Sequence, residues 1–422
     1  MKLFLCRMSI AAMFIVCGLL PARAQTAEAT IKRIFDLPKV KQALENLKAG
    51  EARAIQEQIT ICEIPAPSFQ EERRAAWFKQ RFTELGLKNV RIDKVGNVLG
   101  ERPGKGNGPV LALAAHLDTV FPEGTDVRVK REGAILKGPG IGDDCRGLAV
   151  ILAVARALED AKIETDGTII FVANVGEEGL GDLRGARHLF NEELKGRATH
   201  FISVDGVGAH ITNVAVGVVR YRVTFHGPGG HSFGAFGLPS PIHAMGRAIE
   251  KISRFQVPKQ PKTTFNVGKI EGGTSVNSIA HTAWMEVDMR SESAAELDKL
   301  ETEFKRAVQA AVDEENRARP NKTPITTELK IVSQRPAGVQ AEDSPIVQTA
   351  LAAGAVLGIQ ARLTAGSTDS NIPISLKIPA VTIDGGGEGK GAHALDELFD
   401  TTNSHLGTQR ALLIALGIVG VK

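Results

Sequence analysis

Ionisable residues follow the ends of four apolar segments of this 422-residue sequence. The segments are 110–116, 168–175, 200–205 and 379–385, and the residues at or beyond their ends are His116, Asp118, Glu177, Glu178, Asp205 and His393. Carboxylates gathered in this number must be neutralised by cations or bear strongly shifted pKa values. Imidazole and carboxylate ligands suit Zn²⁺ or a similar divalent ion, and a bridging carboxylate permits two ions. The residue types therefore indicate a metal site.

The segments themselves have the composition of parallel strands that are buried on both faces. VLALAAH (110–116), TIIFVANV (168–175) and HFISVD (200–205) are almost continuously apolar, and helical spacing follows over 147–160. Ligands of open α/β sheets bind beyond the carboxyl ends of the strands, where these ionisable residues lie. We predict an α/β fold with a mixed, largely parallel sheet flanked by helices.

Residues 217–333 have a different pattern, with the order β-α-β-β-α-β of a ferredoxin-like unit. Ser240 is the expected N-cap of the first helix, and Ser293 with Glu296 forms the capping box of the second. We expect an α+β domain inserted into the larger one, with the following division of the chain: leader 1–24, first catalytic part 25–216, insert 217–333 and second catalytic part 334–422.

The loop GPGIGDDCRG (138–147) raises two alternatives, a phosphate cradle and a metal ligand. It contains neither a P-loop sequence nor a G-x-G-x-x-G fingerprint, and adjacent aspartates would repel a phosphate. The metal interpretation is favoured, with either Asp143 or Asp144 as the ligand.

Two other carboxylates have chemistry beyond direct ligation. Asp118 lies two residues from His116, where a carboxylate can hold a ligating imidazole in one tautomer. In the pair Glu177–Glu178, one glutamate can bind metal while the other stays free as a general base.

The N-terminus has the pattern of a secretory signal peptide. Lys2 and Arg7 precede an apolar run that ends at the small-x-small site Ala22-Arg23-Ala24. We expect residues 1–24 to be removed and the mature protein to be periplasmic or secreted, without stable membrane association.

Removal of the leader would take away three basic residues and no acidic one, which leaves 48 of each. A formally neutral chain argues against nucleic acid as a partner. Two cysteines would remain, Cys62 and Cys145, too few for a disulfide scaffold, and we expect no bridge between them.

The motifs AAHLDTV, GPGIGDDCRG, VGEEG, SVDG and GAHALDE together resemble the co-catalytic di-zinc metallopeptidases typified by glutamate carboxypeptidase, peptidase T, aminoacylase and succinyl-diaminopimelate desuccinylase. The resemblance covers nearly all of the mature chain. It implies that His116 and Asp205 bind one zinc ion and that Glu178 and His393 bind the other. Glu177 would be the general base.

The resemblance also implies that Asp143 bridges the two ions and is followed by a cis peptide, with Asp144 as the alternative bridge. A lysine commonly follows the aspartates in this family, whereas Cys145 and Arg146 occupy that region here. The resemblance leaves the roles of these two residues open.

In the insert, the resemblance implies that His231 polarises the scissile carbonyl, often across a dimer. Asn277 and Arg290 match residues that hold a substrate carboxylate, for which a guanidinium is suited by its bidentate fork. The loop that contains Asp369 matches a substrate-facing turn. The insert would act as a lid and as the surface of a homodimer.

The sequence therefore predicts an exported di-zinc metallopeptidase that hydrolyses amide bonds of short peptides through a metal-bridging water. Co²⁺ or Mn²⁺ would also suit the ligands. The alternatives are a deacylase or desuccinylase of N-acyl amino acids and a non-catalytic protein that binds metal or peptide.

Overall fold

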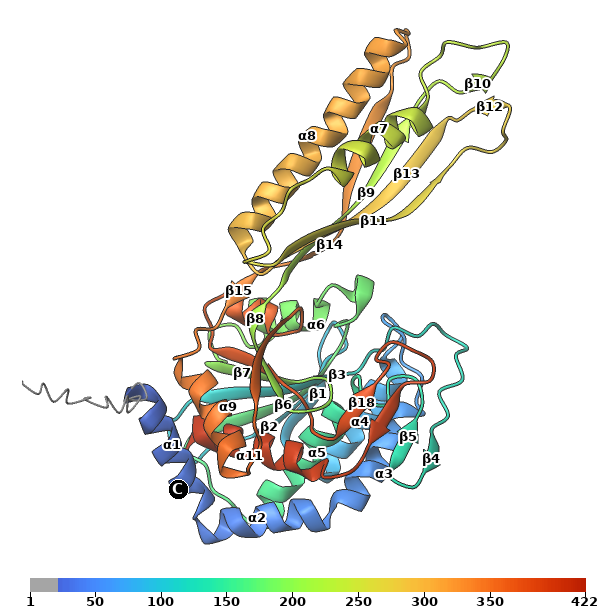
Figure 1. Cartoon of the computed structure of the whole chain (residues 1–422). Helices are drawn as coiled ribbons and strands as arrows, with labels where there is room; N and C mark the ends of the chain where they lie inside the picture. The colour runs from blue at the N-terminus through green and yellow to red at the C-terminus, as the bar shows by residue number, and fades with distance from the viewer. Residues whose placement is uncertain (1–21) are drawn as a thin grey trace, which may run out of the picture.

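The protein, described by a computed structural model over residues 22–422, is built on a nine-stranded mixed sheet (Figure 1). The strand order is β1-β2-β6-β3-β7-β17-β8-β15, and β16 pairs with β8. The pairs β6–β3, β3–β7 and β7–β17 are parallel, as expected for the apolar segments. The bounds are β1 (Lys88–Ile92), β2 (Val98–Arg102), β3 (Val110–His116), β6 (Thr168–Asn174), β7 (His200–Val204), β8 (His210–Ala215), β15 (Gly338–Val339), β16 (Arg362–Gly366) and β17 (Ala380–Ile383).

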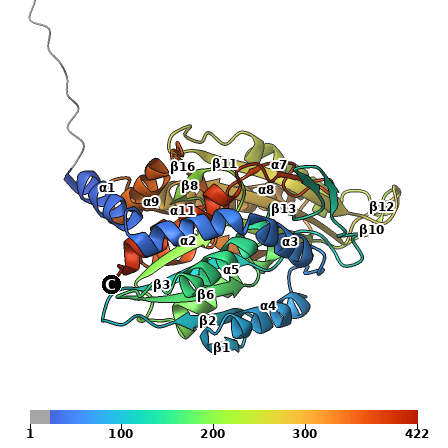
Figure 2. The same cartoon turned by 90° about the horizontal axis from the view of Figure 1, so that it is seen from below.

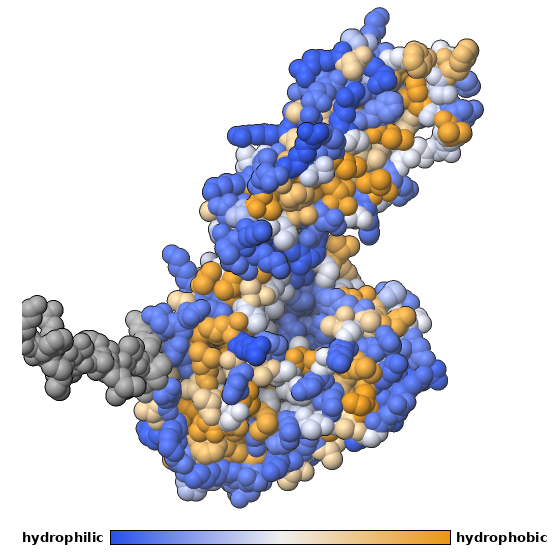
Figure 3. Space-filling view, viewed as in Figure 1, coloured by the Kyte–Doolittle hydropathy of each residue, from blue (hydrophilic) through white to orange (hydrophobic). Residues whose placement is uncertain are grey.

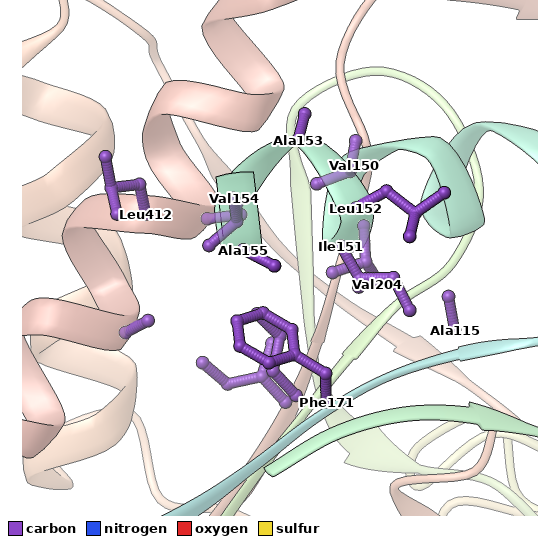
Figure 4. Packing of buried hydrophobic residues seen from close by; sticks show 14 of the residues in the cluster. Ala115, Val150, Ile151, Leu152, Ala153, Val154, Ala155, Phe171, Val204 and Leu412 are labelled. Carbon is purple, nitrogen blue, oxygen red and sulfur yellow. The ribbon is translucent and has the colours of Figure 1, made fainter. Parts of the chain in front are cut away.

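Helices cover both faces of this sheet. Figure 2 shows α2, α5 and α11 on one side, and Figure 4 shows how Val154 and Ala155 of α5 lie near Phe171 of β6. A second, smaller cluster around Phe190 and Phe201 fills the opposite face. The helices are α1 (Ala22–Phe35), α2 (Pro38–Ala49), α3 (Glu51–Cys62), α4 (Glu72–Glu84), α5 (Cys145–Asp160), α6 (Arg184–His188), α9 (Pro345–Val356), α10 (Asn371–Ser375) and α11 (His405–Val419), with short 3₁₀ and π turns at Gly179–Gly181 and Leu189–Glu193.

A small four-stranded sheet brings two distant loops together. Its order is β18-β19-β5-β4, from Glu388–Lys390, Leu398–Asp400, Ile135–Lys137 and Lys130–Glu132. The loop that contains Asp143 leaves β5, and the turn that contains His393 connects β18 to β19. Because β5 and β19 pair directly, the two loops lie side by side.

Residues 217–335 form a separate antiparallel sheet of order β11-β13-β9-β14, with two helices and a core of their own. In chain order this is strand arrangement 4-1-3-2, that of a ferredoxin-like unit. The elements are β9 (Gly217–His226), α7 (Pro241–Ser253), β11 (Thr263–Gly272), β13 (Thr282–Ser291), α8 (Ala294–Ala318) and β14 (Thr326–Arg335), and β10 (Gly230–His231) pairs with β12 (Ser278–Ile279).

Both expected N-caps stand at the starts of helices of this unit. The Ser293 hydroxyl accepts the Glu296 amide at 3.4 Å, whereas Ser240 precedes α7 without a side-chain cap bond. Figure 1 shows the unit projecting from the larger body, and we call it the inserted segment.

Most of the expected leader lies outside the described residues, which begin at Ala22, the first residue of α1. Among the helices of residues 22–422, none combines the length and apolar character required to cross a bilayer.

Candidate metal centre

The carboxyl ends of β3, β6 and β7 and two loops bring the proposed metal ligands together. Donor atoms of His116, Asp143 and Asp205 lie within 4.8 Å of one another, and so do those of Asp143, Glu178 and His393. A third group joins His116 to Glu177 and Glu178. The five residues implied as ligands therefore share one small region.

Asp143 lies at the centre of this region. Its Oδ1 lies 3.0 Å from Nε2 of His116, and its Oδ2 lies 3.1 Å from Nε2 of His393. Glu178 Oε1 lies 3.0 Å from the same His393 nitrogen, and Asp205 Oδ1 lies 3.9 Å from His116 Nε2. The Asp143 carboxylate thus presents one oxygen to His116 and the other to His393.

Asp144 points to different partners. Its Oδ2 accepts the backbone amide of His116 at 2.9 Å, and its Oδ1 accepts the amide of Gly147 at 3.0 Å as the N-cap of α5. Its side chain therefore fixes the end of β3 and the start of α5. The peptide bond between Asp143 and Asp144 is cis.

Asp118 holds both His116 and the glutamate pair. Its backbone carbonyl lies 2.9 Å from Nδ1 of His116, closer than its carboxylate at 3.7 Å. The carboxylate accepts the amides of Glu177 and Glu178 at 3.0 Å each and the hydroxyl of Ser68 at 2.7 Å. Orientation of the imidazole thus comes from the backbone of Asp118, while its side chain fixes the turn after β6.

An arginine that the sequence did not reveal contacts the candidate base. Arg335 Nη1 donates to Glu177 Oε1 at 3.1 Å and to Ser367 Oγ at 3.3 Å, and Nη2 donates to the Glu177 carbonyl. Arg335 is the last residue of β14, so the inserted segment and the candidate base meet at this ion pair. No local pattern marks an arginine 158 residues from its partner.

The loop before α5 is held by a second residue that the sequence did not reveal. Glu397 is only 3% exposed. Its carboxylate accepts hydrogen bonds from the amides of Gly140, Gly142 and Asp143 at 2.9, 3.0 and 3.1 Å. Glu397 is the final residue of the quoted motif GAHALDE.

Cys145 and Arg146, whose roles the resemblance left open, are buried. Arg146 donates to the carbonyls of Gly385 and Ser404 at 2.8 and 2.6 Å, so it ties α5 to the glycine loop after β17 and to the start of α11. Cys145 and Cys62 are both free thiols, and the Cys62 thiol donates to the Pro139 carbonyl at 3.2 Å. These contacts hold loops in place.

Several ionisable groups of the centre have pKa values that are shifted from their usual range. Burial raises the pKa of Asp205 to about 8 against the opposing effect of His116, and burial raises that of Glu177 well above its usual range although Arg335 opposes it. Hydrogen bonds to Asp143 and Glu178 raise the pKa of His393 to about 10. A bound divalent cation would favour the charged forms of these carboxylates and the neutral form of the imidazole. The donor set of imidazole nitrogens and carboxylate oxygens fits such an ion.

Asp369 interacts electrostatically with His116, Asp118 and Arg335. Asn174, at the end of β6, donates to Asp369 at 2.6 Å, and burial raises the pKa of Asp369 to about 6. Asp369 is fully buried, so its carboxylate is not presented to solvent.

Two candidate residues of the inserted segment, His231 and Asn277, are separate from this cluster. His231 and Asn277 lie on paired strands and turns at its far end, where the Ser232 amide donates to the Asn277 carbonyl at 2.9 Å. Within residues 22–422, no hydrogen bond or ion pair joins either of them to the candidate ligands. Arg290 pairs with Asp288 at 2.8 Å, and Asp288 also binds Arg220.

The chain is similar in sequence or in fold to proteins that are named as peptidases. The sequence is 28% identical over 302 residues to carboxypeptidase G2 of a Pseudomonas species, covering 68% of this chain and 69% of that one. The fold matches a tripeptidase of Staphylococcus aureus with a TM-score of 0.72 at 23% identity, covering 86% and 97% of the two chains. It also matches a dinuclear metal binding peptidase of Bacillus subtilis with a TM-score of 0.66 at 19% identity, covering 88% and 99%.

The fold and the cluster of donors define a hydrolase of amide bonds, of a class that depends on metal. A family model matches residues 112–416, more than half of the chain, and the chain belongs to peptidase family M20/M25/M40.

Proposed function

We propose that this chain is an exported two-metal peptidase that cuts amide bonds of short peptides. The observation that carries the proposal is the position of Asp143, whose two carboxylate oxygens lie 3.0 and 3.1 Å from ring nitrogens of two different histidines. A carboxylate so placed can serve two cations at once.

In this proposal one ion is held by His116, Asp205 and Asp143, and the other by Asp143, Glu178 and His393. Zn²⁺ suits these ligands, and Co²⁺ or Mn²⁺ could replace it. When bound, the ions would polarise the scissile carbonyl and lower the pKa of the attacking water.

The remaining chemistry belongs to side chains of this protein. Glu177 would take the proton of the attacking water and deliver it to the leaving nitrogen, a role for which a buried carboxylate of raised pKa is suited. Asp118 would keep the glutamate pair in register by binding both of its amides. Arg335 would orient the Glu177 carboxylate until substrate enters.

The inserted segment would complete the site as a lid. His231 would stabilise the developing oxyanion, and Asn277 and Arg290 would bind a substrate carboxylate. The distance of His231 and Asn277 from the cluster supports a role that requires closure or a second copy of the chain. Figure 3 shows apolar side chains along the inserted segment, where Phe233, Phe236 and Val276 are exposed, which supports a homodimer through this part.

Replacement of the base tests the proposal directly. Glu177→Ala should abolish turnover of a di- or tripeptide while the metal content of the purified protein stays at its original value. Turnover that survives in this variant would show that Glu177 is not the base, and chelator-insensitive turnover would exclude the two-metal mechanism.

A second candidate keeps the same chemistry on N-acyl amino acids, as deacylases and desuccinylases do. Both substrate types contain a linear amide and a free carboxylate. A panel of di- and tripeptides beside N-acetyl and N-succinyl amino acids separates them by kcat/KM. A non-catalytic binding protein would hydrolyse none of the panel.

Export rests on the leader pattern of residues 1–24. Expression of the full chain in a Gram-negative host should release a protein in the periplasmic fraction that lacks these residues. An uncleaved N-terminus in the cytoplasmic fraction would contradict it.

A further inference from the structure

We propose that Glu397 is a positioning residue for the metal centre, because it fixes the loop of Asp143 against the turn of His393. The inference rests on the proposed two-metal function. It concerns a buried residue that lies outside the ligand set.

The side chain of Glu397 holds the Asp143 loop. Its Oε2 accepts the Gly140 amide at 2.9 Å, and its Oε1 accepts the amides of Gly142 and Asp143 at 3.0 and 3.1 Å. Three backbone amides of the loop therefore converge on one carboxylate. A buried amide without an acceptor is costly, which makes the path of the loop depend on Glu397.

The backbone of the same residue holds the His393 turn. The Ala394 amide donates to the Gly391 carbonyl at 2.8 Å, and the Glu397 amide donates to the Ala394 carbonyl at 3.2 Å. The Glu397 carbonyl in turn accepts the Gly138 amide at 3.0 Å. Glu397 therefore closes the turn that contains His393. It also binds the loop that contains Asp143 at both ends, through its carbonyl at Gly138 and its carboxylate at Asp143.

The space around the carboxylate admits little variation. A Cβ added at Gly142 would lie 2.7 Å from Glu397 Oε1, and Gly140 has a φ of +76°. The two glycines thus serve the close approach of the loop to Glu397 as well as its turn. Asp143 must meet His116 and His393 at 3.0 and 3.1 Å at once, so a small shift of the loop would separate it from one of them.

Metal binding by a Glu397→Gln variant tests the inference. Glutamine keeps the shape but turns one acceptor oxygen into an amide donor that faces backbone amides. Glu315→Gln is the matched control, because Glu315 is also buried and accepts a backbone amide, that of Ser240 at 3.0 Å, within the inserted segment. Metal-free parent and variants are titrated with Zn²⁺ by calorimetry, and their melting temperatures are measured without metal.

We expect Glu397→Gln to weaken Zn²⁺ binding at least tenfold, while its metal-free melting temperature falls no further than that of Glu315→Gln. Affinity equal to the parent, or an equal loss of affinity in the control, would overturn the inference. A parent that binds no divalent ion would overturn the proposed function as well, so the two failures are distinguishable.

Gly142→Ala is the second variant, for use if Glu397→Gln does not fold. Its added methyl group displaces the carboxylate without changing any charge. We expect Zn²⁺ affinity to fall at least threefold, and an unchanged affinity would overturn the inference.

Discussion

In the larger body, His116, Glu177 and Glu178 are at most 6% exposed, and each is held by groups from other elements. In the inserted segment, His231 and Asn277 are exposed, and their side chains form hydrogen bonds only with residues of their own turns. The carboxyl ends of β3, β6 and β7 meet at one edge of the sheet, where the side chains that follow them contact one another. The far end of the inserted segment leaves the side chains of His231 and Asn277 exposed, so we expect these two residues to reach substrate only after closure or across a second copy.

The largest effect is expected from the centre of the body. Asp143→Asn should lower kcat/KM on the order of 10³-fold or more, because a neutral amide cannot bridge two cations, and metal content should fall. Asp144→Asn is the matched neighbour and should keep more metal, since its carboxylate binds amides rather than the donor cluster. Equal metal loss in both variants would contradict the assignment of Asp143, and not Asp144, as the bridging ligand.

A smaller effect is expected at the far end of the inserted segment. His231→Ala should lower kcat by about 10²-fold, the usual effect of one lost oxyanion donor, with unchanged metal content. His243→Ala is the control, an exposed histidine of the same segment that pairs with Glu315. If His231→Ala turns over as fast as the control, the far end takes no part in catalysis.

The junction of the two parts is expected to contribute less. Arg335→Gln removes a charged hydrogen bond worth about 2 kcal/mol, so kcat should fall about 30-fold while metal content stays unchanged. Arg335→Lys, which keeps the charge, should recover part of the rate. A variant that instead loses metal would show that Arg335 supports the ligands and not the base.

The pH dependence of metal affinity is the smallest effect that we expect for a change of one pH unit, and it concerns only the larger body. The pKa of His393 is raised to about 10, so its imidazole is protonated at neutral pH and must lose the proton to bind metal. The apparent metal affinity should therefore rise with pH below that value, by about tenfold per pH unit for each proton released. Calorimetry in buffers of different ionisation enthalpy counts the protons. Metal binding without proton release would contradict this charge state.

The sequence predicted the parts of the fold that obey local rules. The apolar segments 110–116 and 168–175 became β3 and β6, since strands buried on both faces require unbroken apolar runs. Asp143 and Asp144 could not be separated by such rules, because they share one loop and differ only in the partners that folding supplies. Arg335 and Glu397 were missed for the same reason, as their partners lie 158 and more than 250 residues away.

The glycine loop that first suggested a phosphate cradle does converge three amides on one anion. That anion is a carboxylate of the same chain, 254 residues later in the sequence than Asp143. A tethered anion has a high effective concentration, so free phosphate or sulfate competes for these amides at a disadvantage. The anion site of this loop is therefore occupied by a side chain of the same protein. A glycine-rich loop can resemble a nucleotide-binding motif in sequence although its amides already bind an internal carboxylate.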